Sequence, residues 1–132
     1  TMIETPRAAL IAGDLAPRVD FMRFGTNDLT QMTYGFSRDD VEASVIKKYI
    51  EMDILQESPF AQLDALGVGK LVQEAINSSR AINPEIKIGI CGEHGGDPTS
   101  IRFLANSGVD YVSCSPPRIP IARLVCAQES LK

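Results

Sequence analysis

The sequence predicts an α/β fold in which four parallel strands alternate with helices. Short apolar segments of strand-like composition alternate along the chain with segments whose apolar residues recur at helical spacing. Such an alternation, without a long spacer, is typical of parallel strands joined by helical crossovers. The length of 132 residues and the hydrophobic share of 44% fit one domain or a piece of one. This pattern leaves open a small doubly wound sheet or half of a (β/α)₈ barrel, since a whole barrel needs about 250 residues.

Each expected element follows from its local residues. A proline in the first turn predicts the start of a helix, because the amide donor that proline lacks has no partner there. Asn83-Pro84 predicts the end of a helix, because proline disfavours a helical conformation of the residue before it. Gly25 is expected to end a strand, and the polar stretch that follows it is expected to be a loop, with Asp39 or Asp40 capping the next helix. The expected elements, in order, are a strand at 1–4, a helix at 6–12, a strand at 19–24, a loop at 25–40, a helix at 41–51, an irregular stretch at 53–66, a helix at 67–82, a strand at 86–90, a helix at 98–107, a strand at 109–113 and a terminal helix after the prolines that follow Ser115.

Composition excludes several classes of function. The net charge of −4 and the absence of a basic cluster argue against nucleic-acid binding. No run of 18 apolar residues is present, so we expect no membrane span, and the opening TMIETPRAAL does not resemble a signal peptide. Three cysteines without a C-x-x-C pair argue against a disulfide framework or zinc ribbon and favour a reducing, cytoplasmic location. Cys114 and Cys126 are expected to be small buried hydrophobes.

Polar residues follow all four expected strands. Functional groups of parallel α/β folds collect at the carboxyl ends of the strands. These ends carry Glu4, residues 25–28 (GTND), residues 91–94 (CGEH) and residues 113–115 (SCS). Packing alone does not require so many polar strand ends, so we expect a site at this edge.

Glu4 and Asp28 are candidate metal ligands. Two carboxylates at one edge suit Mg²⁺, which keeps several waters and takes further oxygen ligands from its substrate. The structural alternative is that Glu4 caps the helix after Pro6 and that Asp28 caps or turns the loop that follows it. The spacing of the two residues does not decide between these readings.

The turn Gly25-Thr26-Asn27 offers backbone amides that can bind a phosphate or carboxylate, although an ordinary turn has the same composition. Cys91 lies between Gly89 and Gly92, where its thiol could act as a nucleophile or as a proton donor, or could simply pack at a strand end. His94, the single histidine, could orient a substrate, relay a proton or carry a phosphoryl group. A lone loop histidine more often bonds its neighbours.

Five segments together resemble the C-terminal domain of the pyruvate, phosphate dikinase family. They span nearly the whole chain in the family's order, and they are specific as a set, although each short piece alone is a weak signal. The segments are MIETPRAAL, FGTNDLTQMTYGFSRDD, GVGKLV, GICGEHGGDP and YVSCSPPRIPIARL.

The resemblance implies a (β/α)₈ barrel that binds phosphoenolpyruvate and pyruvate, of which residues 1–132 are the C-terminal half. The swivelling phosphohistidine domain and the nucleotide-binding domain of the family are absent from this chain. The whole enzyme of the family converts ATP, phosphate and pyruvate into AMP, diphosphate and phosphoenolpyruvate. We therefore expect the 132 residues alone to lack the overall activity and to associate with the missing half or to be marginally folded.

The resemblance also implies roles for individual residues. Glu4 and Asp28 correspond to Mg²⁺ ligands, with Glu4 also near the substrate. Gly25, Thr26, Asn27 and Asp28 correspond to the substrate-binding turn, and Cys91 corresponds to the proton donor at the enolate carbon. The family's carrier histidine lies in a different motif, so His94 is not that residue.

Partners, location and alternatives complete these expectations. By resemblance we expect a homodimer, pyruvate or phosphoenolpyruvate as ligand, and a cytoplasmic location or an organellar one such as a stroma or glycosome. The alternative functions are a phosphoenolpyruvate synthase-type enzyme, a non-catalytic binding or assembly module, and a Mg²⁺-dependent lyase or aldolase that forms an enolate on a related barrel.

Overall fold

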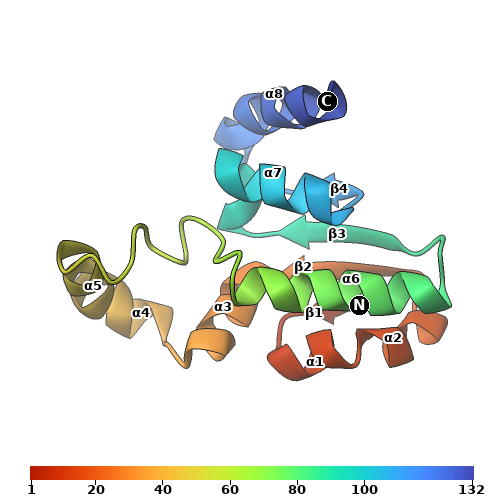
Figure 1. Cartoon of the computed structure of the whole chain (residues 1–132), viewed down its shortest axis with the longest axis horizontal. Coiled ribbons are helices and arrows are strands. Elements are labelled where there is room, and N and C mark those ends of the chain that lie inside the picture. The colour runs from red at the N-terminus through yellow and green to blue at the C-terminus, as the bar shows by residue number, and fades with distance from the viewer.

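The computed structural model describes residues 1–132 and contains four parallel strands that alternate with helices, which confirms the predicted fold class (Figure 1). The strands are β1 (Met2–Ile3), β2 (Phe21–Gly25), β3 (Lys87–Cys91) and β4 (Tyr111–Val112). The helices are α1 (Pro6–Leu10), α2 (Ala12–Leu15), α3 (Thr26–Tyr34), α4 (Arg38–Val41), α5 (Lys47–Glu51), α6 (Val68–Ile82), α7 (Pro98–Ser107) and α8 (Ile119–Ser130). Three 3₁₀ turns (Ala16–Arg18, Glu93–Gly96 and Pro116–Arg118) and one π-helical turn (Glu42–Ile46) complete the chain.

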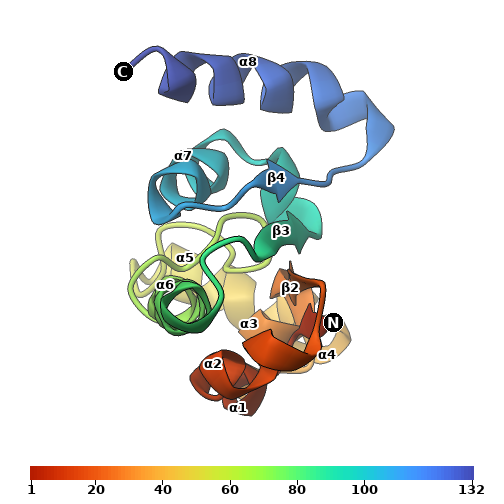
Figure 2. The same ribbon diagram turned by 90° about the vertical axis from the view of Figure 1, so that its right-hand side faces the viewer.

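The strand order is β1-β2-β3-β4, so every strand pairs with its neighbours in the sequence. A doubly wound sheet reverses its strand order near the middle, whereas a barrel adds each new strand on the same side. Because parallel crossovers are right-handed, this sequential order places the crossover helices on one face of the sheet. Figure 2 shows α6 and α7 on the same side of β3 and β4. The arrangement is that of a partial (β/α)₈ barrel, and it decides the question that the sequence left open.

The two faces of the sheet differ in their surroundings. Successive residues of a strand point to opposite faces, and the residues that face the helices form the core with α1, α2 and α6. These core strand residues are Ile3, Met22, Phe24, Ile88 and Ile90, each at most 1% exposed. The opposite face carries Met2, Phe21, Arg23, Lys87 and Cys91, and its apolar members Met2 and Phe21 remain 41% and 46% exposed. This open face corresponds to the interior of a complete barrel.

The predicted helices at 67–82 and 98–107 agree with α6 and α7 to within one residue. Both have a continuous apolar stripe and clear ends. Asp97 caps α7, because its Oδ2 accepts hydrogen bonds from the backbone N–H of Ser100 at 2.7 Å and from the Ser100 hydroxyl at 2.6 Å. Gly108 ends α7 in the left-handed conformation, with φ of 87°.

The predicted loop at 25–40 is wrong over its first ten residues, because α3 begins directly at Thr26. Only three of its residues, Thr26, Leu29 and Thr30, are buried, so the helix is mostly polar and its apolar period is weak. The helix ends at Gly35, whose φ of 67° favours glycine. The next helical stretch begins at Arg38 rather than at residue 41, and neither Asp39 nor Asp40 caps it, since both lie in its first turn.

The helix after Pro6 is also corrected: α1 ends at Leu10, and Ala12 begins α2. None of the eight helices combines the length and the apolar character that a membrane crossing requires.

Candidate functional site

The site predicted from the sequence lies at the carboxyl ends of β1, β2 and β3. Gly25 and Cys91 are partners in the parallel register of β2 and β3, so they lie side by side at the same level of the sheet. Glu4 follows β1 and packs over Gly25. A Cβ atom added at Gly25 would lie 3.0 Å from both the Cβ and the Oε2 of Glu4. The structure therefore brings Glu4, the start of α3 and Cys91 together at one edge.

The start of α3 presents unpaired backbone donors to this edge. Because α3 begins at Thr26, the N–H groups of its first residues have no acceptor inside the helix, and the helix dipole favours an anion there. The Oδ1 atom of Asn27 is buried without a hydrogen-bond partner. The backbone of Gly92 lies close to the first residues of α3, since a Cβ atom at Gly92 would lie 3.2 Å from both Asn27 Oδ1 and Thr26 Oγ1. Its φ of 118° is one that side chains rarely adopt, so glycine is required.

The two carboxylates are free to bind a ligand. Thr5 caps α1 through its hydroxyl, which accepts a hydrogen bond from the N–H of Ala8 at 3.1 Å, so the capping role considered for Glu4 is not the observed one. Asp28 is exposed and accepts one hydrogen bond, 3.2 Å long, from Gln31 to its Oδ1. None of the ion pairs in the chain involves Glu4 or Asp28. No cluster of three or more His, Cys, Asp or Glu side chains is present, so protein ligands alone would not complete a metal site.

Cys91 is the last residue of β3 and is half-buried rather than sealed beneath the sheet. Its Sγ lies 3.5 Å from the carbonyl oxygen of Phe24 and 3.8 Å from the Sδ of Met2. Burial raises the pKa of the Cys91 thiol, the guanidinium of Arg23 opposes the shift, and the charges of Glu4 and Asp28 add to it. The thiol therefore stays protonated at neutral pH.

One layer below the thiol, Met2, Arg23, Gly89 and Tyr111 are aligned across the four strands. The guanidinium of Arg23 lies 5.8 Å from the centre of the Tyr111 ring, a cation–π distance, and the ring lies over Gly89. Sequence reasoning missed this layer beneath the site. The two-residue period of β2 could have revealed it, because that period puts Arg23 on the same face as Gly25.

His94 lies away from the open edge. Its side chain is completely buried, and both ring nitrogens are hydrogen-bonded, to the hydroxyl of Thr26 at 2.7 Å and to the carbonyl of Pro59 at 2.8 Å. Cys114 and Cys126, expected to be buried, are only partly so, and they pack against a small cluster formed by Ile101, Ala122 and Val125.

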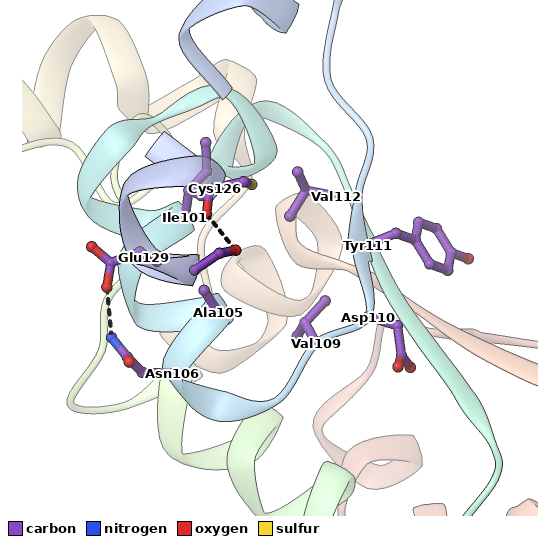
Figure 3. Close-up of a pocket in the computed structure, with 10 residues that line it drawn as sticks. Ile101, Ala105, Asn106, Val109, Asp110, Tyr111, Val112, Cys126 and Glu129 are labelled. Carbon is purple, nitrogen blue, oxygen red and sulfur yellow. Dashed lines mark hydrogen bonds between the residues drawn. The ribbon is translucent and has the colours of Figure 1, made fainter. Parts of the chain in front are cut away.

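The cavities of the chain lie beside the predicted site rather than in it. None of the five is lined by Glu4, residues 25–28 or Cys91, because these residues face the open side of the sheet. A polar cavity of about 220 Å³ adjoins the edge next to Gly92 and Arg118. Another cavity, of about 360 Å³, lies between α7, β4 and α8; in Figure 3 the side chains of Asp110 and Tyr111 turn away from the two helices. This cavity reaches the amino end of β4, opposite the functional edge, and none of the predicted site residues lines it.

Comparisons with known proteins agree with the resemblance seen in the motifs. The model of the family described as PEP-utilising enzyme, PEP-binding domain, matches residues 1–131. The chain is 59% identical to pyruvate, phosphate dikinase 1, chloroplastic, of Arabidopsis thaliana and 58% identical to pyruvate, phosphate dikinase, chloroplastic, of Flaveria pringlei. It is also 58% identical to pyruvate, phosphate dikinase 2 of Zea mays. Each match covers 97% of this chain but only 13% or 14% of the relative, so the chain spans a small part of their length.

Proposed function

This chain belongs to the family of PEP-utilising enzymes, within their PEP-binding domain, and from this premise we propose that it forms the enolate-handling part of a pyruvate, phosphate dikinase-type phosphotransferase. The observation that carries the proposal is the meeting of Glu4, the start of α3 and Cys91 at one edge of the sheet. Anion-binding amides, free carboxylates and a protonated thiol are the groups that the interconversion of pyruvate and phosphoenolpyruvate requires.

The reaction proposed for the whole protein is ATP + phosphate + pyruvate giving AMP + diphosphate + phosphoenolpyruvate. In this domain pyruvate loses a methyl proton, and the enolate oxygen attacks a phosphoryl group carried by a histidine of another domain. In the reverse direction phosphoryl loss leaves the enolate, which takes a proton at carbon to become pyruvate. The names of the relatives support the dikinase, with phosphate as acceptor, over the synthase-type alternative.

Cys91 exchanges the proton with the methyl carbon. A thiol can donate a proton to an enolate carbon only if it is protonated at the working pH, and burial together with Glu4 and Asp28 raises the pKa of Cys91. Its place at the end of β3, beside Gly25, directs the thiol toward a small planar molecule bound at the start of α3. In the direction of phosphoenolpyruvate synthesis the deprotonated sulfur, a thiolate, takes the proton from the methyl carbon and becomes the thiol.

Residues 25–28 bind the substrate. The free N–H groups at the start of α3 donate hydrogen bonds to its carboxylate or phosphoryl oxygens, and the helix dipole adds to the attraction. Asn27 lies against Gly92 between the second and third strands, so its amide is available to orient the same molecule.

Glu4 and Asp28 would hold a divalent cation, for which Mg²⁺ is the best fit. Neither carboxylate takes part in an ion pair. Together with substrate oxygens and water, the two carboxylates would match the oxygen ligands that Mg²⁺ prefers. When bound, the ion would supply positive charge that stabilises the enolate oxygen.

The remainder of the protein supplies the other half of the barrel, the phosphohistidine carrier and the nucleotide-binding domain. The open face with its exposed Met2 and Phe21 supports a covering half of the barrel, since soluble proteins rarely leave such a sheet face uncovered. We also propose a homodimer. The word chloroplastic in several relatives' names supports the organellar location over the cytoplasmic one.

Exchange of the methyl protons of pyruvate with solvent deuterium, followed by NMR in the intact protein, tests this proposal. Cys91→Ala is expected to slow the exchange by about 10²- to 10⁴-fold, the usual contribution of a positioned acid–base group. Cys126→Ala is the matched control, because it removes a half-buried thiol from α8 and should leave the rate unchanged. Exchange at the wild-type rate in Cys91→Ala would show that the thiol has no such role.

A further inference from the structure

His94 joins three parts of the chain that are far apart in the sequence. It lies three residues beyond Cys91, in the 3₁₀ turn after β3, and its side chain is completely buried. One ring nitrogen bonds Thr26, the first residue of α3, and the other bonds Pro59 in the irregular stretch that precedes α6. The imidazole is thus a bridge between the ends of β2 and β3 and a loop.

The partners fix which nitrogen carries hydrogen. The carbonyl of Pro59 can only accept, so Nε2 of His94 donates to it over 2.8 Å. Burial lowers the pKa of His94, which favours the neutral ring, and Nδ1 of a neutral ring then accepts from the Thr26 hydroxyl over 2.7 Å. The Thr26 hydroxyl also lies 3.3 Å from the carbonyl oxygen of Cys91, a longer and weaker contact.

A small change in the orientation of Thr26 would change the direction of the N–H groups at the start of α3. It is the first residue of α3, so its orientation sets the direction of the free N–H groups of the residues that follow it. It is fully buried, and Gly92 packs against both Thr26 and Asn27. A fixed Thr26 hydroxyl therefore keeps the start of α3 and the end of β3 at a constant separation.

We propose that His94 is a positioning residue that holds Thr26, and with it the start of α3, in the orientation that binds the pyruvate or phosphoenolpyruvate anion. This role rests on the function proposed above. His94 does not touch the substrate. It acts through the hydrogen bond from Thr26, and its bond to Pro59 anchors the ring from behind.

Two substitutions separate the two hydrogen bonds. In His94→Asn the amide group takes the place of Nδ1, so the bond from Thr26 can be kept and the one to Pro59 is lost. In His94→Gln the amide reaches the place of Nε2, so the bond to Pro59 can be kept and the one from Thr26 is lost. Each variant loses one neutral hydrogen bond, so a purely structural role of His94 predicts similar effects from both.

The test compares the KM for phosphoenolpyruvate and the rate of methyl-proton exchange of pyruvate in the intact protein and in both variants. We expect His94→Gln to raise the KM about tenfold, the order of one hydrogen bond, and His94→Asn to stay within about twofold of wild type. Equal effects of the two variants, or greater damage in His94→Asn, would overturn the proposal. An inactive wild-type protein would instead contradict the proposed function.

Two further measurements test the positioning role of His94 independently of the two KM values. Amide hydrogen exchange at residues 30–32, whose N–H groups bond the carbonyls of residues 26–28 in the first turn of α3, requires no turnover and is expected to be about tenfold faster in His94→Gln than in His94→Asn; equal rates would overturn the positioning role. If a histidine variant does not fold, Thr26→Val removes the same bond from the other side and Thr26→Ser retains it. A KM of Thr26→Val within twofold of that of Thr26→Ser would also overturn the role.

Discussion

Replacement of Gly89 by alanine is expected to destabilise the sheet locally at β3, because the added methyl group clashes with Tyr111. A Cβ atom at this position would overlap the ring of Tyr111, and even the third-nearest ring atom, Cε1, would lie only 2.5 Å away. The ring would have to move by more than about 1 Å before its nearest atom reached ordinary contact at 3.4 Å, and this movement would weaken its 5.8 Å contact with Arg23. Overpacking of this kind costs about 1–3 kcal/mol, and a cation–π contact is worth about 0.5–1 kcal/mol. We therefore expect a loss of about 2 kcal/mol.

Amide hydrogen exchange of β3 in the intact protein measures this loss locally, without requiring two-state unfolding of a large chain. A loss of about 2 kcal/mol corresponds to roughly 30-fold faster exchange at residues 88–90. In a Tyr111→Ala background the ring is absent, so adding Gly89→Ala should change the rate by less than about twofold. A rate increase below about threefold in the wild-type background, or the same increase in both backgrounds, would refute the steric reasoning.

Three further outcomes are expected. Because burial and nearby carboxylates raise the pKa of Cys91, the rate of its alkylation by iodoacetamide should reach its midpoint above pH 9.0, the ordinary value, and a midpoint at or below that pH would contradict the raised pKa. Asp97→Ala should destabilise α7 by about 1 kcal/mol through loss of its cap, whereas Asp97→Asn should retain most of it; thermal unfolding that does not distinguish the two variants would exclude the capping role. Burial lowers the pKa of His94 below 6.5 in the folded state, so the unfolded chain binds a proton first as the pH falls. The stability that the neutral histidine contributes is fully present above pH 6.5 and decreases as the pH falls from 6.5 toward the pKa of His94 in the folded state. Denaturant titrations should show a smaller decrease of the free energy of unfolding over this pH range in His94→Asn than in wild type.

Local sequence was sufficient for elements with strong periodicity and clear ends. The helices α6 and α7 were predicted to within one residue because Pro98, Gly108 and Asn83-Pro84 act within a few residues of the helix ends. The helix α3 was missed because most of its surface is polar, and what holds it is contact of Thr26, Leu29 and Thr30 with the rest of the fold. Propensity is a weak guide where tertiary packing supplies the stability.

The positions of the site residues were predictable in part. Parallel strands share one functional edge, so Glu4, residues 25–28 and Cys91 could be assigned to that edge from the strand ends alone. Their chemical roles remain predictions. The protonated state of Cys91 could not be derived from the sequence, because burial and neighbouring charges set it only after the strands are aligned.

By itself, the sequence determined the alternation of strands and helices, the α/β class and the polar ends of the strands, since these depend on residues within one or two turns of one another. Only the tertiary structure decided the strand order β1-β2-β3-β4, the placing of Tyr111 over Gly89 and the bonds of His94. The partners of His94 lie 68 and 35 residues away along the chain. Such contacts depend on how the crossovers bring distant segments together, and a local pattern of residues does not encode which distant segments meet.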